Sequence, residues 1–291
     1  MIVITGATGK LGHEVVQQLL TKVEGSQIVL AVRNVEKASD FASQGVEVRY
    51  ADYDRPETLT SAFQGASKVL LISGNELGKR SAQHRNAVEA VRASGAGLLV
   101  YTSILGADRA GISLAAEHLA TEELIRASGI PFVFLRNGWY IENYTDNLGP
   151  ALTYGAISGS AGDGRIAAAT RADYAAAAVA VLVGEGHAGR VYELAGDHTF
   201  SMAELAAEVA HQVGKPVVYH NLTPAQYQAL LVNVGLPLPV AEMLVDADVH
   251  IQQGELNSDS RDLHALIGRA TTPLAEGVRT ALARSQAERN S

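Results

Sequence analysis

The sequence predicts an α/β fold, a doubly wound parallel Rossmann sheet with a smaller C-terminal α/β substrate lobe. Three observations predict this fold class. Short apolar runs alternate with helical patterns through the first half of the chain. These runs are continuously apolar, as in parallel strands that are buried on both faces. A glycine-rich turn also joins the first run to the first helical pattern, as in nucleotide-binding βαβ units.

The first half contains six runs rich in Val, Ile and Leu, separated by segments with helical periodicity. The expected strands are residues 2–5, 28–32, 46–50, 69–73, 98–103 and 132–135. The expected helices are residues 10–20, 35–44, 56–63, 83–93 and 113–127. Right-handed crossovers would then place these helices on both faces of one parallel sheet.

The second half is richer in Gly and Ala at its start and then carries helix-capping signals. Three pairs have the spacing of a capping box, and they are Thr170 with Asp173, Ser201 with Glu204, and Thr223 with Gln226. Short strands are expected at 191–194 and 217–219. We expect a nucleotide-binding domain over 1–136 and a substrate lobe over 137–291, with 165–197 packed back onto the first sheet. The ligand site should lie in the cleft between them.

Composition excludes several classes of function. The net charge of −8 argues against nucleic acid or an anionic membrane as the main partner. The absence of cysteine excludes thiolate nucleophiles, disulfides and Cys-ligated metal centres. No two histidines have the spacing of a zinc motif, so no metal site is expected. The longest apolar run, residues 174–183, is too short to span a bilayer, and no basic leader precedes the first strand. We therefore expect a cytoplasmic protein without membrane insertion.

The first turn carries the strongest motif. Gly6, Gly9 and Gly12 lie between a buried strand and a helix, where they permit a tight turn, close approach of a diphosphate and close helix–strand packing. The helix N-terminus offers free N–H groups to the phosphates. The expected contacts in this loop are Gly6, Ala7, Thr8, Gly9, Lys10, Leu11 and Gly12. The alternative is a tight turn that binds no ligand.

The end of the second strand indicates which nucleotide binds. An NAD-selective site places Asp or Glu there, but this strand ends in Arg33, whose guanidinium can bind a 2′-phosphate and stack on adenine. Lys10 adds a second cation. NADPH is therefore the expected cofactor, and the alternative is that Arg33 is only a solvated residue. Asp52 is expected at the adenine amino group, although an exposed turn Asp is a comparable interpretation.

The chain resembles the NmrA-like branch of the atypical short-chain dehydrogenase/reductase family, and within it the bacterial type 2 NAD(P)H:quinone oxidoreductases. The resemblance extends over nearly the whole length. It rests on residues 5–12, 32–34, 83–86, 101–103, 117–118, 121–122, 135–144, 161–165, 170–174 and 192–197. It implies NADPH binding in the first domain and quinone reduction in the cleft between the lobes.

The remaining cofactor contacts follow the fourth, fifth and sixth strands. Small residues after the fourth strand would let the backbone pass beside the nicotinamide ribose. The expected contacts are Ser73, Gly74, Asn75, Thr102, Asn137, Gly138, Trp139, Tyr140 and Asn143. Trp139, Tyr140 and Tyr144 could stack on a quinone ring, and Asn143 could bond a carboxamide or quinone oxygen. The alternative is that these aromatic residues only seal the interface between the lobes.

The catalytic Tyr-x-x-x-Lys pair of most short-chain dehydrogenases is missing. Leu114 occupies the usual Tyr position and His118 the usual Lys position. His118 could contact the nicotinamide ribose or donate to a quinone oxygen, or it could be a helix-surface residue. Without a proton donor of the usual kind, an easily reduced acceptor is favoured. His118, Asn143 and Tyr140 are the expected catalytic residues.

Two functions therefore follow from the sequence. The first is an oxidoreductase that transfers hydride from NADPH to a quinone, with a homodimer allowed. The alternative is an NADP(H)-binding redox sensor without turnover, which would explain the missing Tyr equally well. An epimerase, dehydratase or aromatic-ether reductase on the same fold is a third interpretation, which the missing Tyr and Lys weaken.

Overall fold

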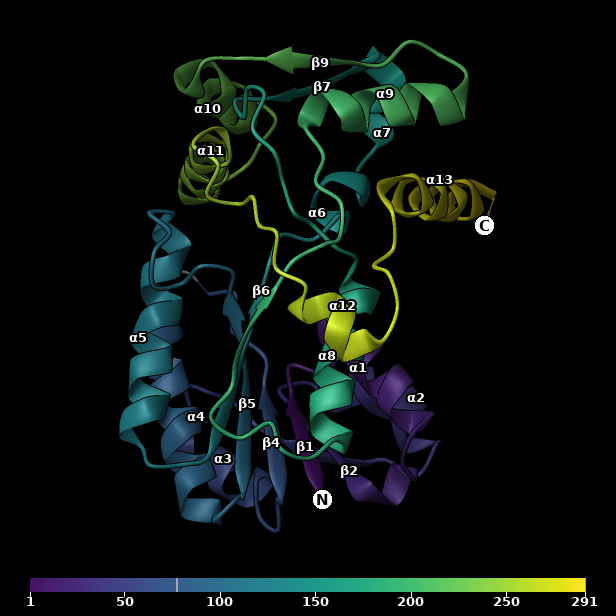
Figure 1. Cartoon of the computed structure of the whole chain (residues 1–291). Coiled ribbons are helices and arrows are strands. Elements are labelled where there is room, and N and C mark those ends of the chain that lie inside the picture. Colours follow the sequence, from purple (N-terminus) through teal and green to yellow (C-terminus); the bar gives the residue numbers. More distant parts are fainter. Residues whose placement is uncertain (77, 291) are drawn as a thin grey trace.

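The computed structural model describes residues 1–76 and 78–290, with the side chains of all of them except 288–290. Seven strands of this described chain form one sheet in the order β3-β2-β1-β4-β5-β6-β8, and every neighbouring pair is parallel. The strands are β1 Ile2–Thr5, β2 Ile28–Val32, β3 Glu47–Tyr50, β4 Lys68–Leu71, β5 Leu98–Ile104, β6 Phe132–Asn137 and β8 Val191–Leu194. The fold class predicted from the sequence is confirmed (Figure 1).

Helices cover both faces of this sheet. One face carries α1 Lys10–Leu20, α2 Ser39–Ala42, α8 Arg171–Val183 and α12 Asp262–Ile267. The other carries α3 Pro56–Ala62, α4 Arg80–Ser94 and α5 Ser113–Ala127. All five residues of β2 are buried, as expected for a strand with helices on both sides. The single helix predicted over 35–44 is wrong: a 3₁₀ turn, Glu36–Ala38, precedes the short α2.

The second lobe lies beyond the carboxyl ends of the strands (Figure 1). It contains α6 Glu142–Thr145, α7 Gly149–Tyr154, α9 Met202–Val213, α10 Pro224–Asn233, α11 Leu238–Gln252 and α13 Leu274–Asn290. A small parallel sheet pairs β7 Ala156–Gly159 with β9 Val218–Asn221. Ligands of open α/β sheets bind at this carboxyl edge. The second lobe therefore stands beside the edge where a site is expected.

Two of the three predicted capping boxes are confirmed, those opening α9 and α10. The third is incomplete. Thr170 caps α8 by accepting from the Asp173 amide, but the Asp173 carboxylate does not return to the backbone of Thr170. This carboxylate is fully buried: its Oδ1 lies 2.7 Å from Nη2 of Arg269, and its Oδ2 accepts from the Thr170 hydroxyl and the Thr272 amide, so both oxygens have other partners.

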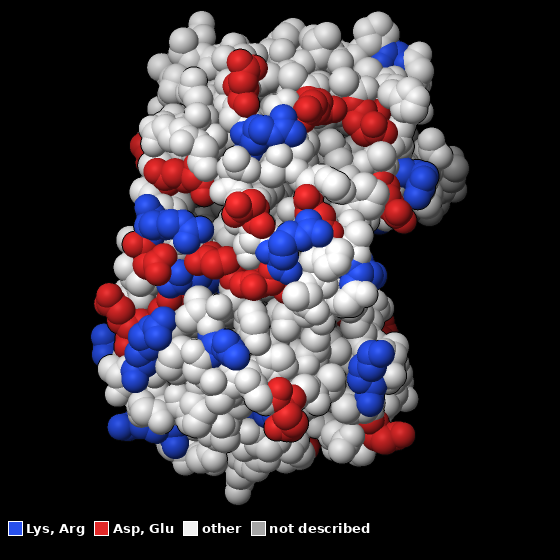
Figure 2. Space-filling model, viewed as in Figure 1, with Lys and Arg blue, Asp and Glu red and all other residues white. Residues whose placement is uncertain are grey.

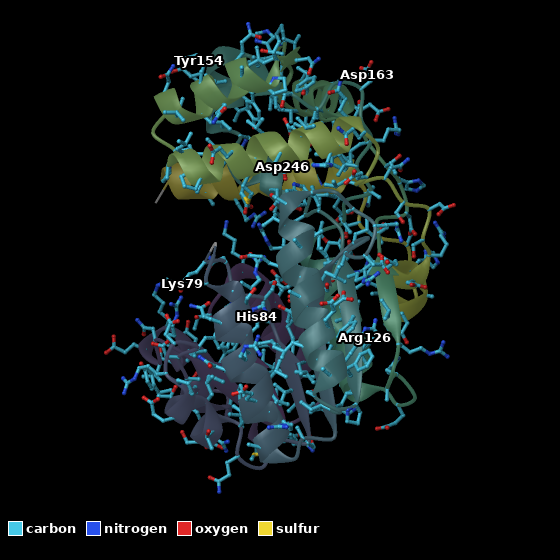
Figure 3. All side chains as sticks on the ribbon, turned by 90° about the vertical axis from the view of Figure 1, so that its left-hand side faces the viewer. Lys79, His84, Arg126, Tyr154, Asp163 and Asp246 are labelled. Carbon is cyan, nitrogen blue, oxygen red and sulfur yellow. The ribbon has the colours of Figure 1, made fainter. Side chains whose placement is uncertain are left out.

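The chain passes between the two lobes several times. After β6 it enters the second lobe, and it returns through 161–169 to α8, which packs against α1, and to β8, which pairs with β6. Figure 2 shows charged side chains of both signs crowded across the middle of the molecule, where the lobes meet. On another side Asp246 of α11 lies above α5 (Figure 3), and its Oδ2 accepts from the Ser113 amide at 2.8 Å. The division at residue 136 stays a prediction.

No helix in the described residues combines the length and the hydropathy needed to cross a membrane. Within the same residues, no group of three His, Asp or Glu side chains could hold a metal ion.

Candidate nucleotide-binding and active site

The glycine loop after β1 forms a tight backbone cradle. Gly6 has a φ of +61°, in the left-handed region that favours glycine, and its carbonyl accepts from the Gly9 amide at 3.0 Å. Helix α1 then begins at Lys10 without any side-chain cap on its first N–H groups. Ala7 and Leu11 are buried, whereas Gly6, Thr8, Gly9 and Lys10 are exposed. The loop thus presents backbone N–H groups and the positive end of a helix dipole to solvent, which is what a diphosphate requires.

Gly12 holds the helix against this loop. A Cβ at this position would lie 2.3 Å from the Gly6 carbonyl oxygen and 2.7 Å from Cα of Ala7. Those neighbours are backbone atoms and cannot move aside by changing rotamer. The close helix–strand packing expected from the motif is therefore present.

Both cations expected at the nucleotide phosphates make ion pairs. Nη1 of Arg33, just after β2, lies 2.8 Å from Oε1 of Glu76 on the loop between β4 and α4. Nζ of Lys10 lies 2.7 Å from Oδ2 of Asp146, which follows α6 in the second lobe. Glu76 was not expected at the end of β2, because it lies 43 residues from Arg33 in sequence.

Asp52 lies in the turn after β3. Its Oδ1 accepts from the Asp54 amide at 3.0 Å, and its own amide donates to Thr58 Oγ1 at 2.9 Å. The carboxylate therefore stabilises its own turn. A contact with adenine, as expected from the sequence, stays a proposal.

The loop after β4 is fixed by hydrogen bonds from two sides. The Ser73 amide donates to Oγ1 of Thr102 at 2.9 Å, so these two expected cofactor contacts lie together. The Gly74 amide donates to Nε2 of His84 at 3.0 Å, and the Gly74 carbonyl accepts from Nε of Arg80 at 2.8 Å. Asn75 is exposed. The backbone of this loop is therefore held in place before any ligand binds.

The contacts of His84 determine its protonation. Because the Gly74 amide donates to Nε2, the proton must lie on Nδ1, which donates to Thr121 Oγ1 at 2.9 Å. Burial, and then the Arg80 guanidinium, lowers the pKa of His84 to about 3. His84 is thus a neutral residue that positions the loop.

His118 is buried, with 7% of its surface exposed, so the interpretation of a helix-surface residue is wrong. Its Nδ1 lies 2.8 Å from the hydroxyl of Tyr101 on β5. Burial, and then Arg80 and His84, holds the pKa of His118 well below its usual value. With the Tyr101 hydroxyl as donor, the proton of the neutral imidazole lies on Nε2.

The segment after β6 divides between the two lobes. Asn137 is buried, and its Oδ1 has no hydrogen-bond partner among the described residues. Gly138 packs so closely that a Cβ would meet the Tyr174 hydroxyl at 2.8 Å. Close packing therefore explains why this position is a glycine. Tyr140 packs on the core of the first domain and lies under the Arg171 guanidinium, 5.2 Å from the ring centroid.

The expected aromatic platform is not a single surface. Trp139 and Tyr144 pack against the core of the second lobe, whereas Tyr140 packs against the first. The ring of Tyr144 meets Phe200 edge-on at 6.2 Å, and its hydroxyl is buried without a partner among the described residues. Tyr144 therefore packs within the second lobe, which neither the ring-stacking interpretation nor its alternative expected, and Trp139 and Tyr140 remain as candidate contacts.

The three expected catalytic residues do not form one hydrogen-bonded group within the described residues. His118 bonds Tyr101 beside α5, while Tyr140 packs on the opposite face of the sheet. Asn143 is exposed, and its Oδ1 lies 3.5 Å from Nη2 of Arg171. A ligand over the carboxyl edge of the sheet would have to connect them.

A cavity of about 620 Å³ adjoins the glycine loop. Of the expected site residues only Thr8, Gly9 and Lys10 line it, together with side chains of α1, α6, α8 and α13 that include Arg171 and Arg284. The residues expected at the nicotinamide are not among its walls.

The sequence analysis did not identify four residues that hydrogen-bond or ion-pair with the expected site residues, namely Glu76, Arg80, His84 and Tyr101. The family-like strings at 83–86 and 101–103 were the only available signal for His84 and Tyr101. Their roles depend on contacts between elements that periodicity cannot identify. Arg80 and Glu76 had no signal at all.

Known proteins resemble this chain over nearly its whole length. The family profile described as NAD(P)H-binding matches residues 6–184. The chain is 52% identical to quinone oxidoreductase 2 of Escherichia coli (strain K12) over 278 residues, which are 96% of this chain and 97% of that protein.

Two solved structures are similar over nearly the whole chain. A crystal structure of an NADPH-dependent quinone oxidoreductase from Escherichia coli complexed with NADPH has a TM-score of 0.94 and 51% identity, covering 97% of this chain and 100% of that one. The Citrobacter sp. triphenylmethane reductase complexed with NADP(H) has a TM-score of 0.93 and 43% identity, again covering 97% and 100%.

Proposed function

Because the chain belongs to the NAD(P)H-binding family, we propose that it is an NADPH-dependent oxidoreductase that transfers hydride to a quinone. The observation that carries the proposal is the uncapped glycine cradle, with Arg33 at the end of the neighbouring strand. The residues fit the cofactor: Gly6 and Gly9 have no side chains that would block a diphosphate, and the buried Oδ1 of Asn137, which has no partner among the described residues, can accept from a donor such as a carboxamide. NADPH, when bound, supplies the hydride.

The chain's own residues would bind the cofactor and orient its nicotinamide half. Gly6, Thr8, Gly9 and Lys10 bind the diphosphate, and Arg33 binds the 2′-phosphate. Ala7, Leu11 and Gly12 are buried and hold that loop in place. Ser73 and Gly74, held by Thr102 and His84, position the nicotinamide half. Asn75, Asn137, Gly138 and Asp52 complete the proposed cofactor contacts.

The proposed catalytic residues are His118, Tyr140 and Asn143. A neutral His118 donates a hydrogen bond through Nε2 to the cofactor ribose or to the acceptor oxygen. Asn143 is exposed and can bond an acceptor oxygen, while Trp139 and Tyr140 offer apolar ring surface. A quinone needs no strong acid, since its reduced form is a stable phenolate.

The test is to mix the protein with NADPH and a small benzoquinone and to follow absorbance at 340 nm. Turnover that depends on the acceptor and exceeds the uncatalysed rate is expected. Tight NADPH binding without turnover would instead support the NADP(H) sensor, and absence of binding would refute both functions.

The homodimer that the sequence allows and the cytoplasmic location stay predictions. Sedimentation equilibrium of the purified protein tests the first, and fractionation of the source cells tests the second. A monomer at micromolar concentration would contradict the homodimer.

A further inference from the structure

Glu76 places a carboxylate at the end of β2, where the sequence itself carries no acidic residue. In dinucleotide-binding folds an acidic residue at the end of the second strand accepts hydrogen bonds from the ribose hydroxyls. That position carries Arg33 in this chain. The loop between β4 and α4 brings Oε1 of Glu76 to 2.8 Å from Nη1 of Arg33, so an acid stands there after all.

The ion pair joins the two flanks of the glycine loop. β2 and β4 are the two neighbours of β1 in the sheet, and the glycine loop follows β1 directly. Arg33 follows one neighbour and Glu76 the other. A nucleotide whose diphosphate lies on the loop directs its adenosine ribose toward the end of β2. Glu76 and Arg33 are therefore both within reach of the 2′ position, which is the only difference between NADPH and NADH.

A ligand phosphate can replace Glu76 as the partner of Arg33. The side chain of Arg33 is 61% exposed and that of Glu76 is 31% exposed, and ion pairs of this kind contribute little to stability. A phosphate can bind the guanidinium through two charge-assisted hydrogen bonds, which are stronger. Arg33 can thus leave Glu76 when a 2′-phosphate arrives.

Glu76 stays ionised through a second cation. Oε2 of Glu76 lies 3.2 Å from Nζ of Lys79, and this hydrogen bond, together with Arg33, holds the pKa of Glu76 below its usual value against the effect of burial. In Figure 3 Lys79 lies at the margin of the first domain on the side of the second lobe, with His84 lower on α4. Glu76 is therefore a hydrogen-bond acceptor only, suited to a ribose hydroxyl and repelled by a phosphate.

We propose that Glu76 is a specificity-determining residue that sets the balance between NADPH and NADH. It competes with the 2′-phosphate for Arg33, and it accepts a hydrogen bond from the 2′-hydroxyl of NADH. The inference rests on the proposed function only in requiring that a nicotinamide nucleotide binds.

The test is calorimetric titration of the wild type and Glu76→Gln with NADPH and NADH, and with 2′,5′-ADP and 5′-AMP, which lack the nicotinamide half. Glu76→Gln should bind NADPH and 2′,5′-ADP about two- to fivefold more tightly, because a surface ion pair no longer competes. It should bind NADH and 5′-AMP about three- to tenfold more weakly, because a charged acceptor is lost.

Two further variants make the result specific. Glu57→Gln removes a carboxylate on α3 from a more exposed ion pair with Arg55, which precedes that helix, and it should leave the NADPH-to-NADH affinity ratio unchanged. Arg33→Ala should weaken NADPH far more than NADH, and on that background Glu76→Gln should no longer tighten NADPH. An affinity ratio for Glu76→Gln equal to that of the wild type would overturn the inference while leaving the proposed function intact. If neither nucleotide bound the wild type, the proposed function itself would be refuted.

Discussion

Replacing Gly12 by Ala tests whether the glycine cradle depends on close packing of α1. The added Cβ would lie 2.3 Å from the Gly6 carbonyl oxygen and 2.7 Å from Cα of Ala7. Carbon atoms in contact normally lie about 3.5–4 Å apart, so the N-terminus of α1 must move by roughly 1 Å. Burial of Val15, Val16 and Leu19 on the same helix resists that movement.

The expected cost follows from this geometry. Forcing a methyl group into a packed core costs about 1–3 kcal/mol, and each kcal/mol lowers the melting temperature of a chain of this size by about 2–4 °C. Misplacing the free N–H groups of α1 by about 1 Å loses about one hydrogen bond to a charged phosphate, which should weaken NADPH binding by about 10- to 100-fold. Thermal unfolding and calorimetric titration measure the two effects.

Two glycines serve as comparisons. A Cβ at Gly9 would approach the Gly6 carbonyl oxygen to 3.2 Å, a milder contact, so Gly9→Ala should lose NADPH affinity with a nearly unchanged melting temperature. A Cβ at Gly97 would lie at an ordinary 3.5 Å from Ser67, and Gly97→Ala should change neither quantity. A Gly12→Ala protein with wild-type stability and affinity would refute the packing argument.

The other predictions concern the buried pair of His118 and Tyr101 and the buried Asp248. His118→Ala should lower turnover about 10²-fold with little change in NADPH affinity, and Tyr101→Phe should lower it about two- to tenfold by removing the partner of Nδ1. Stopped-flow rates should show no further loss in the double variant, whereas independent losses would contradict a shared role. Burial raises the pKa of Asp248 from 3.8 to about 6, so the native state holds more protons than the unfolded chain between about pH 4 and 6, and stability falls as pH rises through that window. Denaturant titrations of Asp248→Asn should lose this slope and gain up to about 3 kcal/mol above pH 6, and an unchanged slope would exclude Asp248 as its source.

Local signals were sufficient for most of the first domain. β1, β2, α1 and α5 have the bounds predicted from the sequence, because apolar runs and helical periodicity are properties of neighbouring residues. The helix predicted over 35–44 failed because only Ala38 and Phe41 of its two short pieces are buried, which is too little to support a longer helix. β7 was missed because its Gly- and Ala-rich surroundings hide any strand pattern.

The site was only partly predictable for a different reason. The glycine loop is contiguous in sequence, so its geometry could be inferred from three residues. The acid at Arg33 comes from a loop 43 residues away, and the partner of His118 lies 17 residues before it on another element. Such contacts depend on how β4, β5, α4 and α5 are stacked, and no short-range pattern encodes that stacking.

The pairing of Tyr101 with His118 bears on the choice of acceptor. A Tyr in place of Leu114 would have been a proton donor. The tyrosine that this chain places near His118 is Tyr101 on β5, where burial raises the pKa of the hydroxyl and the hydroxyl is hydrogen-bonded to His118. A neutral His118 can donate a hydrogen bond but cannot act as an imidazolium acid near pH 7. An unactivated ketone would form a strongly basic alkoxide that needs a proton at once, whereas a reduced quinone is stable as an anion. The same residues that fail to reproduce the usual catalytic pair therefore favour quinones over simple ketones as acceptors.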